Sequence, residues 1–265
     1  MINEPNPPNQ YGQPQPAGAP AAAPNTVAGG VRVGAAAVPR EGFLTASFVW
    51  MFIGLLLSAG SAWFVMSNPA TMAQVIDNWF ILLIGQLALV FGLSFLITRL
   101  PSIVALGAFF VYALLMGLTL GVIVAAYTAE VDPVTGQLVF TNVAGVVTAF
   151  LGASAIFAGA ALYGAVTKRD LTSLQGILFM GLLGLLVVML VQVFFFPGSG
   201  WLNLAIGVVG VVIFTGLTAW DVQRIRNGQV AGINSESASV MGALALYLDF
   251  VNLFLFLLRI FGNSR

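Results

Sequence analysis

Two aspartates stand in apolar surroundings in the last fifth of the sequence. Asp249 lies near the middle of the apolar run 240–262, and Asp221 ends the preceding run directly after Trp220. An ionised carboxylate at the centre of a membrane-spanning helix costs about 2.5–3.5 kcal/mol on insertion scales, so such residues are protonated, paired or turned toward water. Because intramembrane acids usually mark ion or proton pathways, we predict a pH-sensing site on an ion pathway at Asp221 and Asp249.

Polar residues at helical spacing accompany both acids. Asn252 and Arg259 follow Asp249 on one helix face, and Thr218 shares a face with Asp221. We therefore expect Asn252, Arg259 and Thr218 to form a supporting polar face. Structural alternatives remain open: Asp249 as a neutral acid bonded to backbone, and Asp221 as an interfacial acid paired with Arg224 one turn away, which contributes only a few tenths of a kcal/mol.

Arg99 ends the second apolar run just before Pro101. It is either a topology anchor at the membrane boundary or the counter-ion of one of the aspartates. If Asp221 and Asp249 meet, they titrate as one coupled pair rather than as two independent groups.

The absence of cysteine and histidine narrows the chemistry. Disulfides, thiolate or imidazole metal sites and histidine-based triads are excluded, so proton chemistry falls to carboxylates. Any bound metal needs oxygen ligands, which favours a hard cation, and Asp221 and Asp249 are the candidate ligands for calcium as a transported ion. We expect no prosthetic group. A net charge of zero leaves no basic face for nucleic acid.

The composition requires a polytopic membrane protein to position these residues. Of 265 residues 59% are hydrophobic and 7% charged, and the mean hydropathy is +1.00. The chain from residue 41 to 265 divides into seven runs near the length of a membrane-spanning helix, which predicts an all-α bundle: 43–66, 79–98, 102–127, 142–163, 173–196, 201–223 and 239–261. Residues 1–40 contain eight of the 12 prolines and should be a disordered tail.

The distribution of basic residues predicts the orientation of the bundle. Alternate connections carry all the basic residues near the first six spans, whereas the facing connections carry only acids, namely Asp77, Glu130 and Asp132. By the positive-inside rule, the N-terminus is cytoplasmic. The basic residues counted are Arg32, Arg40, Arg99, Lys168, Arg169, Arg224 and Arg226. Arg259 and Arg265 then lie on the far side, against the rule.

Several segments resemble a known family. The stretch ALYLDFVNLFLFLLRIFGN over 245–263 is the most specific, because it combines an acid, an asparagine and an arginine on an apolar helix. Together with GLTAWDVQ (216–223), TKRDL (167–171) and YALLMGLT (112–119), it is similar to the Bax inhibitor-1 family, in the bacterial branch that includes YccA, YbhL and YetJ. Trp220 stands where that family usually has tyrosine.

The resemblance implies seven helices with the last one surrounded by the other six. It also implies a pH-sensitive calcium leak in which the aspartates of the sixth and seventh helices, here Asp221 and Asp249, form a pair that an arginine, here Arg99, latches. Relatives of this kind lie in the bacterial plasma membrane and have been associated with a membrane-bound quality-control protease. The oligomeric state does not follow from it.

Three functions therefore compete. The first is the pH-gated cation leak, and the second is a non-transporting regulator that binds a membrane protease or another membrane partner. The third is an intramembrane aspartyl protease, in which two aspartates act as acid and base. Such proteases place glycine beside the second aspartate, whereas Leu246 and Leu248 flank Asp249 here. We therefore favour the leak and expect no enzymatic activity.

Overall fold

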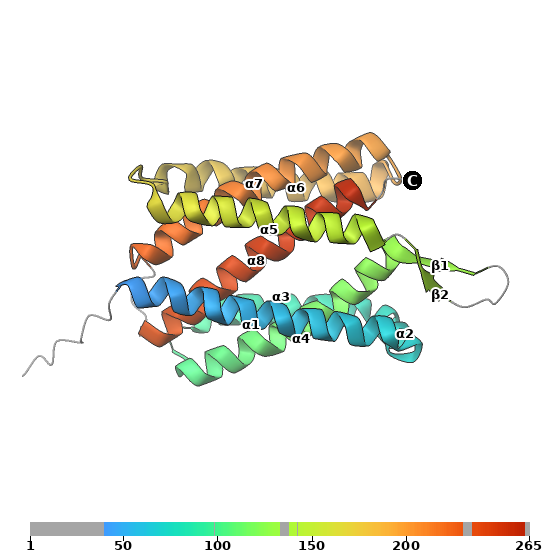
Figure 1. Ribbon diagram of the computed structural model, residues 1–265, viewed down its shortest axis with the longest axis horizontal. Coiled ribbons are helices and arrows are strands. Elements are labelled where there is room, and N and C mark those ends of the chain that lie inside the picture. Colours follow the sequence, from blue (N-terminus) through green and yellow to red (C-terminus); the bar gives the residue numbers. More distant parts are fainter. Residues whose placement is uncertain (1–39, 98, 133–137, 142, 230–234, 263–265) are drawn as a thin grey trace, which may run out of the picture. The chain divides into compact units, whose positions relative to one another are not determined.

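The computed structural model describes residues 40–97, 99–132, 138–141, 143–229 and 235–262. In these ranges the chain forms eight helices and one pair of short strands: α1 (Arg40–Ser67), α2 (Pro69–Asp77), α3 (Trp79–Leu96), α4 (Ser102–Thr128), β1 (Ala129–Val131), β2 (Leu138–Phe140), α5 (Val143–Val166), α6 (Thr172–Phe195), α7 (Gly200–Arg226) and α8 (Ser235–Phe261) (Figure 1). Apart from Arg40, whose backbone begins α1, the tail that we expected to be disordered lies outside the described residues.

Seven of the helices can cross a bilayer, counted over the described part of the chain. The shortest, α3, has 18 residues, which at 1.5 Å per residue reaches about 27 Å, close to the thickness of the hydrocarbon core. These helices coincide with the seven apolar runs of the sequence. The predicted all-α architecture with seven membrane-spanning helices is confirmed.

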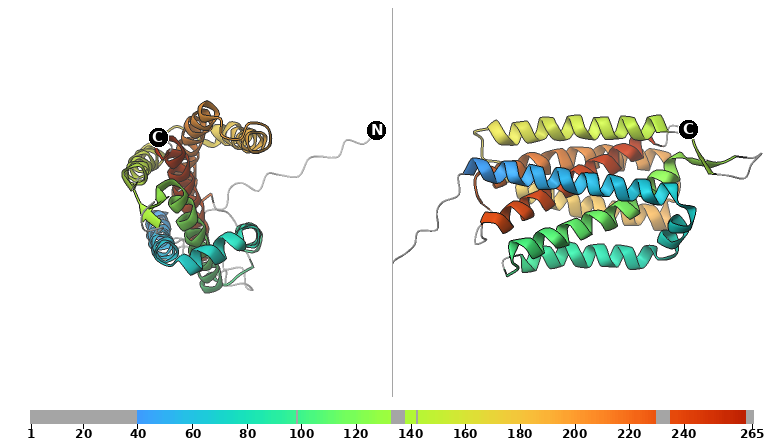
Figure 2. Two further views of the ribbon diagram at one scale, coloured as in Figure 1. Left: turned by 90° about the vertical axis from the view of Figure 1, so that its right-hand side faces the viewer. Right: turned by 60° about the horizontal axis from the view of Figure 1, so that its bottom comes forward.

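Helix α8 forms the centre of the bundle. It packs against α1, α4, α5 and α7, and the end-on view of Figure 2 shows it surrounded by these helices. Of the most apolar window of α8, 72% of the residues are buried, against 11% for α3 and for α6. Helix α3 packs mainly on α4, and α6 packs on α7. The predicted central position of the last helix is therefore confirmed, but four of the other six spans pack closely around it, and α3 and α6 lie outside them on α4 and α7.

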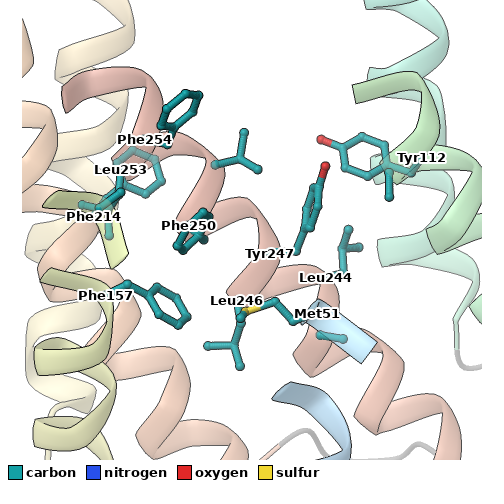
Figure 3. Close-up of a cluster of buried hydrophobic side chains, with 14 of the residues drawn as sticks. Met51, Tyr112, Phe157, Phe214, Leu244, Leu246, Tyr247, Phe250, Leu253 and Phe254 are labelled. Carbon is teal, nitrogen blue, oxygen red and sulfur yellow. The ribbon is translucent and has the colours of Figure 1, made fainter. Parts of the chain in front are cut away.

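Aromatic side chains on α8 fill the space between its neighbours (Figure 3). Tyr247 is fully buried, and its ring meets those of Phe109 and Tyr112 on α4 edge to face, with centroids 5.6 and 5.9 Å apart. Its hydroxyl lies 2.6 Å from Ser58 Oγ on α1, and Ser58 also donates to the carbonyl of Ala113 at 2.7 Å. This hydrogen-bonded contact links α1, α4 and α8 at one point in the apolar interior.

Glycines allow two of the closest helix approaches. A Cβ atom added at Gly117 on α4 would lie 2.6 Å from Ser61 Cβ and would also overlap the backbone of Ser58 on α1. A Cβ atom added at Gly164 on α5 would overlap the carbonyl of Ala219 on α7. Close backbone approach through small residues is how membrane helices pack without a hydrophobic driving force between them.

Two connections contain structure that the hydropathy of the sequence did not predict. The segment between the first two spans forms α2, which starts with Pro69 at its first position and is capped by Asn68, whose side chain accepts from the N–H groups of Ala70 and Thr71. Proline at the first helical turn and asparagine before it are strong start signals. The connection after α4 forms the antiparallel pair β1–β2, with Glu130 opposite Val139.

Candidate functional site: a buried carboxyl pair

Helices α7 and α8 bring the two predicted acids together. Asp221 lies in the last two turns of α7 and is 8% exposed, and Asp249 lies near the middle of α8 and is 4% exposed. Their carboxyl groups lie next to each other. Two adjacent ionised carboxylates repel each other and neither has a donor, and a proton on one of them relieves that repulsion.

The polar surroundings of Asp249 leave one of its oxygens unsatisfied. Thr218, on the α7 turn before Asp221, is fully buried and places its hydroxyl beside the Asp249 carboxyl group. The same hydroxyl also donates to the carbonyl of Phe214 at 2.8 Å. Oδ2 of Asp249 is buried without a hydrogen-bond partner among the described residues. A buried oxygen without a donor costs free energy, and it is available to a proton or a cation.

The cation Arg224 lies beside Asp221, one of the two acids. The guanidinium Nη1 of Arg224 lies 3.9 Å from Asp221 Oδ1, and the Arg224 Cζ atom lies 5.1 Å from the centre of the Trp220 ring. This is the ion pair of Asp221 that the sequence left open as an alternative to the carboxyl pair. The structure contains both, so Asp221 stands between a cation and a second acid.

Arg99 occupies a different place. Its side chain is exposed in the connection between α3 and α4, and within the described ranges it forms no ion pair with either aspartate. Its backbone N–H donates to the carbonyl of Leu96, which continues the turn at the end of α3. In this arrangement the cation next to the carboxyl pair is Arg224.

The other predicted polar residues of α8 have hydrogen-bond partners other than the acids. Asn252 is half-buried, and its side-chain amide donates to the carbonyl of Leu248 on its own helix at 2.8 Å. Arg259, in the last turn of α8, donates to Asn203 Oδ1 at 2.9 Å and to Gln192 Oε1 at 2.8 Å. Gln192 also donates to Asn203, so a closed polar cluster joins α6, α7 and α8 at the end of α8 remote from the aspartates.

The connection between α5 and α6 is bonded to the end of α7 by two residues that sequence reasoning did not assign to a site. Gln223 accepts from the N–H of Leu171 at 2.8 Å and donates to the carbonyl of Arg169 at 2.7 Å. Arg226 donates to the carbonyls of Ala165 and Thr167 at the C-terminal end of α5. Their position in the sequence, within one and a half turns of Asp221, was the available signal.

Asp170, in the same connection, caps the start of α6. Its carboxylate accepts from the backbone N–H of Thr172 at 2.9 Å. Hydrogen bonds from the hydroxyl and the backbone N–H of Thr172 lower the pKa of Asp170 below its ordinary value. Because the folded-state pKa is the lower one, this cap stabilises the fold above the ordinary carboxyl range and is lost as the pH falls below it.

The carboxyl pair lacks the ligands of a resident metal site. Over the described residues, no group of three or more Asp, Glu, His or Cys side chains converges. Calcium takes six to eight oxygen ligands, and a pair of carboxyl groups supplies at most four. Asp221 and Asp249 alone therefore supply too few ligands for a resident calcium ion.

A polytopic α-helical membrane protein with a buried carboxyl pair between its last two spans is the class that this geometry defines. Residues 40–265 match the family described as inhibitor of apoptosis-promoting Bax1. The chain belongs to this family, the Bax inhibitor-1 family, and the resemblance seen in the sequence is confirmed.

Relatives match over most of their length. The inner membrane protein YbhL of Escherichia coli is 39% identical over 86% of this chain and 95% of its own. A protein of Deinococcus radiodurans is 43% identical over 84% of this chain and 90% of its own. The protein YrjE of Lactococcus lactis is 36% identical over 83% and 90%. The name of the Escherichia coli relative refers to the inner membrane, in agreement with the seven spans found here.

Proposed function

We propose that the protein is a pH-sensitive cation leak pathway of a bacterial inner membrane, in which the Asp221–Asp249 pair is the proton-operated element and calcium is the transported ion. The observation that carries this proposal is the contact of two buried carboxyl groups, one of which has an oxygen without a donor. If the pair served only to hold α7 and α8 together, we would expect every carboxyl oxygen to have a hydrogen-bond donor, because an unpaired buried oxygen destabilises the fold.

Protonation changes the charge that the pair presents to its surroundings. With one shared proton the pair carries a single negative charge, which Arg224 offsets at 3.9 Å. Loss of that proton leaves two adjacent negative charges and one cation, so the excess charge repels within the pair and attracts a cation. Proton binding and cation binding at the pair therefore compete, and this competition makes the flux depend on pH.

Arg99 is the second cation of the proposal. The family resemblance assigns it the role of a latch on Asp221, and a latched state would need the exposed Arg99 side chain to move toward α7 and displace Arg224 from Asp221. The proposed orientation has a cytoplasmic N-terminus, because Lys168, Arg169 and Arg99 then face the cytoplasm.

Reconstitution into liposomes that contain a calcium indicator tests the proposal. Calcium entry through the unaltered protein should change with pH, and Asp249→Asn should remove that dependence because an amide does not titrate. Asp221→Asn should do the same, and it serves as a second variant if the first does not fold. The control is Asp77→Asn, which removes the same charge from an exposed position at the end of α2 and should leave the profile unaltered.

An Asp249→Asn protein that folds and retains the pH profile of the unaltered protein would overturn the proposal. The alternative role, a regulator that binds a membrane protease or other membrane partner, predicts a stoichiometric crosslinked partner in native membranes and no flux. The buried acids favour the leak, because a docking surface needs no carboxyl pair in its interior. An aspartyl protease is less well supported, since Leu246, which is fully buried, and Leu248 stand where such proteases have glycine.

A further inference from the structure

Helices α5 and α6 both pack on α7, and a groove lies over α7 between them. Figure 2 shows α7 between the other two helices in the end-on view. The groove has a volume of about 350 Å³, and Thr215, Gly216 and Ala219 of α7 line its floor. Neither aspartate of the carboxyl pair is among the residues that line it.

Small residues give the groove its depth. Gly159 and Ala160 form part of the α5 wall, and a Cβ atom added at Gly159 would meet nothing within 4 Å. Leu174 forms part of the α6 wall. The residues that line the groove include no charged side chain. Such a surface suits an acyl chain, because each buried methylene group stabilises the complex.

One end of the groove adjoins a basic segment. Leu171 lines the groove, and Lys168 and Arg169 come three and two residues before it in the α5–α6 connection. Both side chains are exposed, and the ion pair described for this chain involves neither of them. The acid of the same segment, Asp170, is engaged by the start of α6 through the N–H of Thr172.

The basic segment is held in place rather than free to spread. Gln223 bonds to the backbone of Leu171 and of Arg169, and Arg226 bonds to the carbonyls that end α5. Four hydrogen bonds between α7 and this connection therefore hold the backbone that carries the two cations, close to Leu171 of the groove. Basic residues beside an apolar groove between membrane helices are the arrangement that binds an anionic lipid headgroup.

We propose that this groove is a binding site for an anionic phospholipid, with one acyl chain along the floor formed by α7 and the phosphate at Lys168 and Arg169. The site is separate from the carboxyl pair and does not depend on the leak activity. It predicts that the protein retains a negatively charged phospholipid through purification in preference to a zwitterionic one of the same chain length.

Native mass spectrometry of the full chain in mild detergent tests this, with dioleoylphosphatidylglycerol and dioleoylphosphatidylcholine as probes. The unaltered protein should bind the phosphatidylglycerol more tightly. The double variant Lys168→Gln/Arg169→Gln should weaken that binding by about 30-fold, because each basic residue near an anionic headgroup contributes about 1 kcal/mol. Arg99→Gln, which removes an exposed cation remote from the groove, should not weaken it.

Filling the groove provides a second, uncharged test. Gly159→Leu should reduce retention of both lipids at this site, whereas Gly184→Leu, at an equally open position on α6 outside the groove, should not. Equal affinity for the two lipids in the unaltered protein would overturn the proposal, as would binding that survives both sets of variants. A change of oligomeric state in Gly159→Leu without loss of lipid would assign the groove to a second copy of the chain instead.

Discussion

The two carboxyl groups show how a residue's neighbours decide what its charge can do. Asp221 touches both a cation and an acid, while Asp249 touches an acid and a hydroxyl group and has one oxygen without a donor. Protons therefore leave and join the two residues as a pair, and a measured titration belongs to the pair rather than to either aspartate. A probe of one carboxyl group should report both steps.

The identity of the counter-ion is testable at the same scale. Arg224→Gln removes the cation beside Asp221 and makes the doubly ionised pair less favourable. We expect the midpoint of the pH profile of calcium flux to move to higher pH, since the pair then keeps its shared proton longer. Flux measurements in liposomes between acidic and alkaline pH give that midpoint directly.

Arg99→Gln tests the competing assignment, in which Arg99 rather than Arg224 neutralises Asp221. If Arg224 is the counter-ion, the Arg99 variant keeps the midpoint of the unaltered protein. A shift produced by Arg99→Gln with none from Arg224→Gln would instead assign the role to Arg99 and require a second arrangement of the α3–α4 connection.

At the scale of elements, the α1–α4 contact depends on the missing side chain at Gly117. Gly117→Ala places a methyl group against the backbone of Ser58, and overpacking of this kind costs about 1–3 kcal/mol. Gly107→Ala on the same helix meets nothing within 4 Å and should be neutral or stabilising, because alanine is the better helix former. Unfolding of both variants in the same detergent, followed by circular dichroism, measures the difference. Equal stabilities of the two variants would show that the packing of α1 on α4 does not depend on the glycine at position 117.

The hydropathy of the sequence predicted the seven membrane-spanning helices, but it predicted little of the structure in the connections between them. The seven spans follow from runs of apolar residues, because a bilayer requires that length of any crossing helix. Helix α2 and the β1–β2 pair are too short to show in such runs, although Asn68 and Pro69 form a readable start signal for α2. Helix α2 is held by its cap and by burial of Met72 and Val75 against Val65 and Ala125, and β1–β2 is held by strand pairing.

The contact of Asp221 with Asp249 was not predictable from spacing. Asp221 lies five residues before the end of α7 and Asp249 lies 14 residues inside α8. At 1.5 Å per residue, those depths differ by about 13 Å along the helix axes. The acids meet because α8 crosses the bundle obliquely, as Figure 1 shows. A crossing angle depends on side-chain packing among several helices, and a single sequence does not display it.

For the whole molecule, the absence of cysteine makes the proposed orientation directly measurable. A single cysteine introduced at Lys168 should react with an impermeant thiol reagent only from the cytoplasmic side, and one introduced at Asp77 only from the outside. Both positions are exposed and lie outside the spans. Inverted and right-side-out membrane vesicles separate the two cases, and the reverse labelling pattern would mean that the bundle is inserted the other way round.

The central place of α8 has a consequence for biogenesis. The ribosome makes this helix after the other seven, yet it supplies the side chains around which α1, α4, α5 and α7 close. Until α8 enters the bilayer, Ser58 lacks its partner Tyr247 and Asp221 lacks its neighbour Asp249. Before α8 inserts, the nascent chain is therefore an incompletely packed intermediate in which these polar groups lack their partners. Membrane chaperones or proteases can act on the chain during that interval.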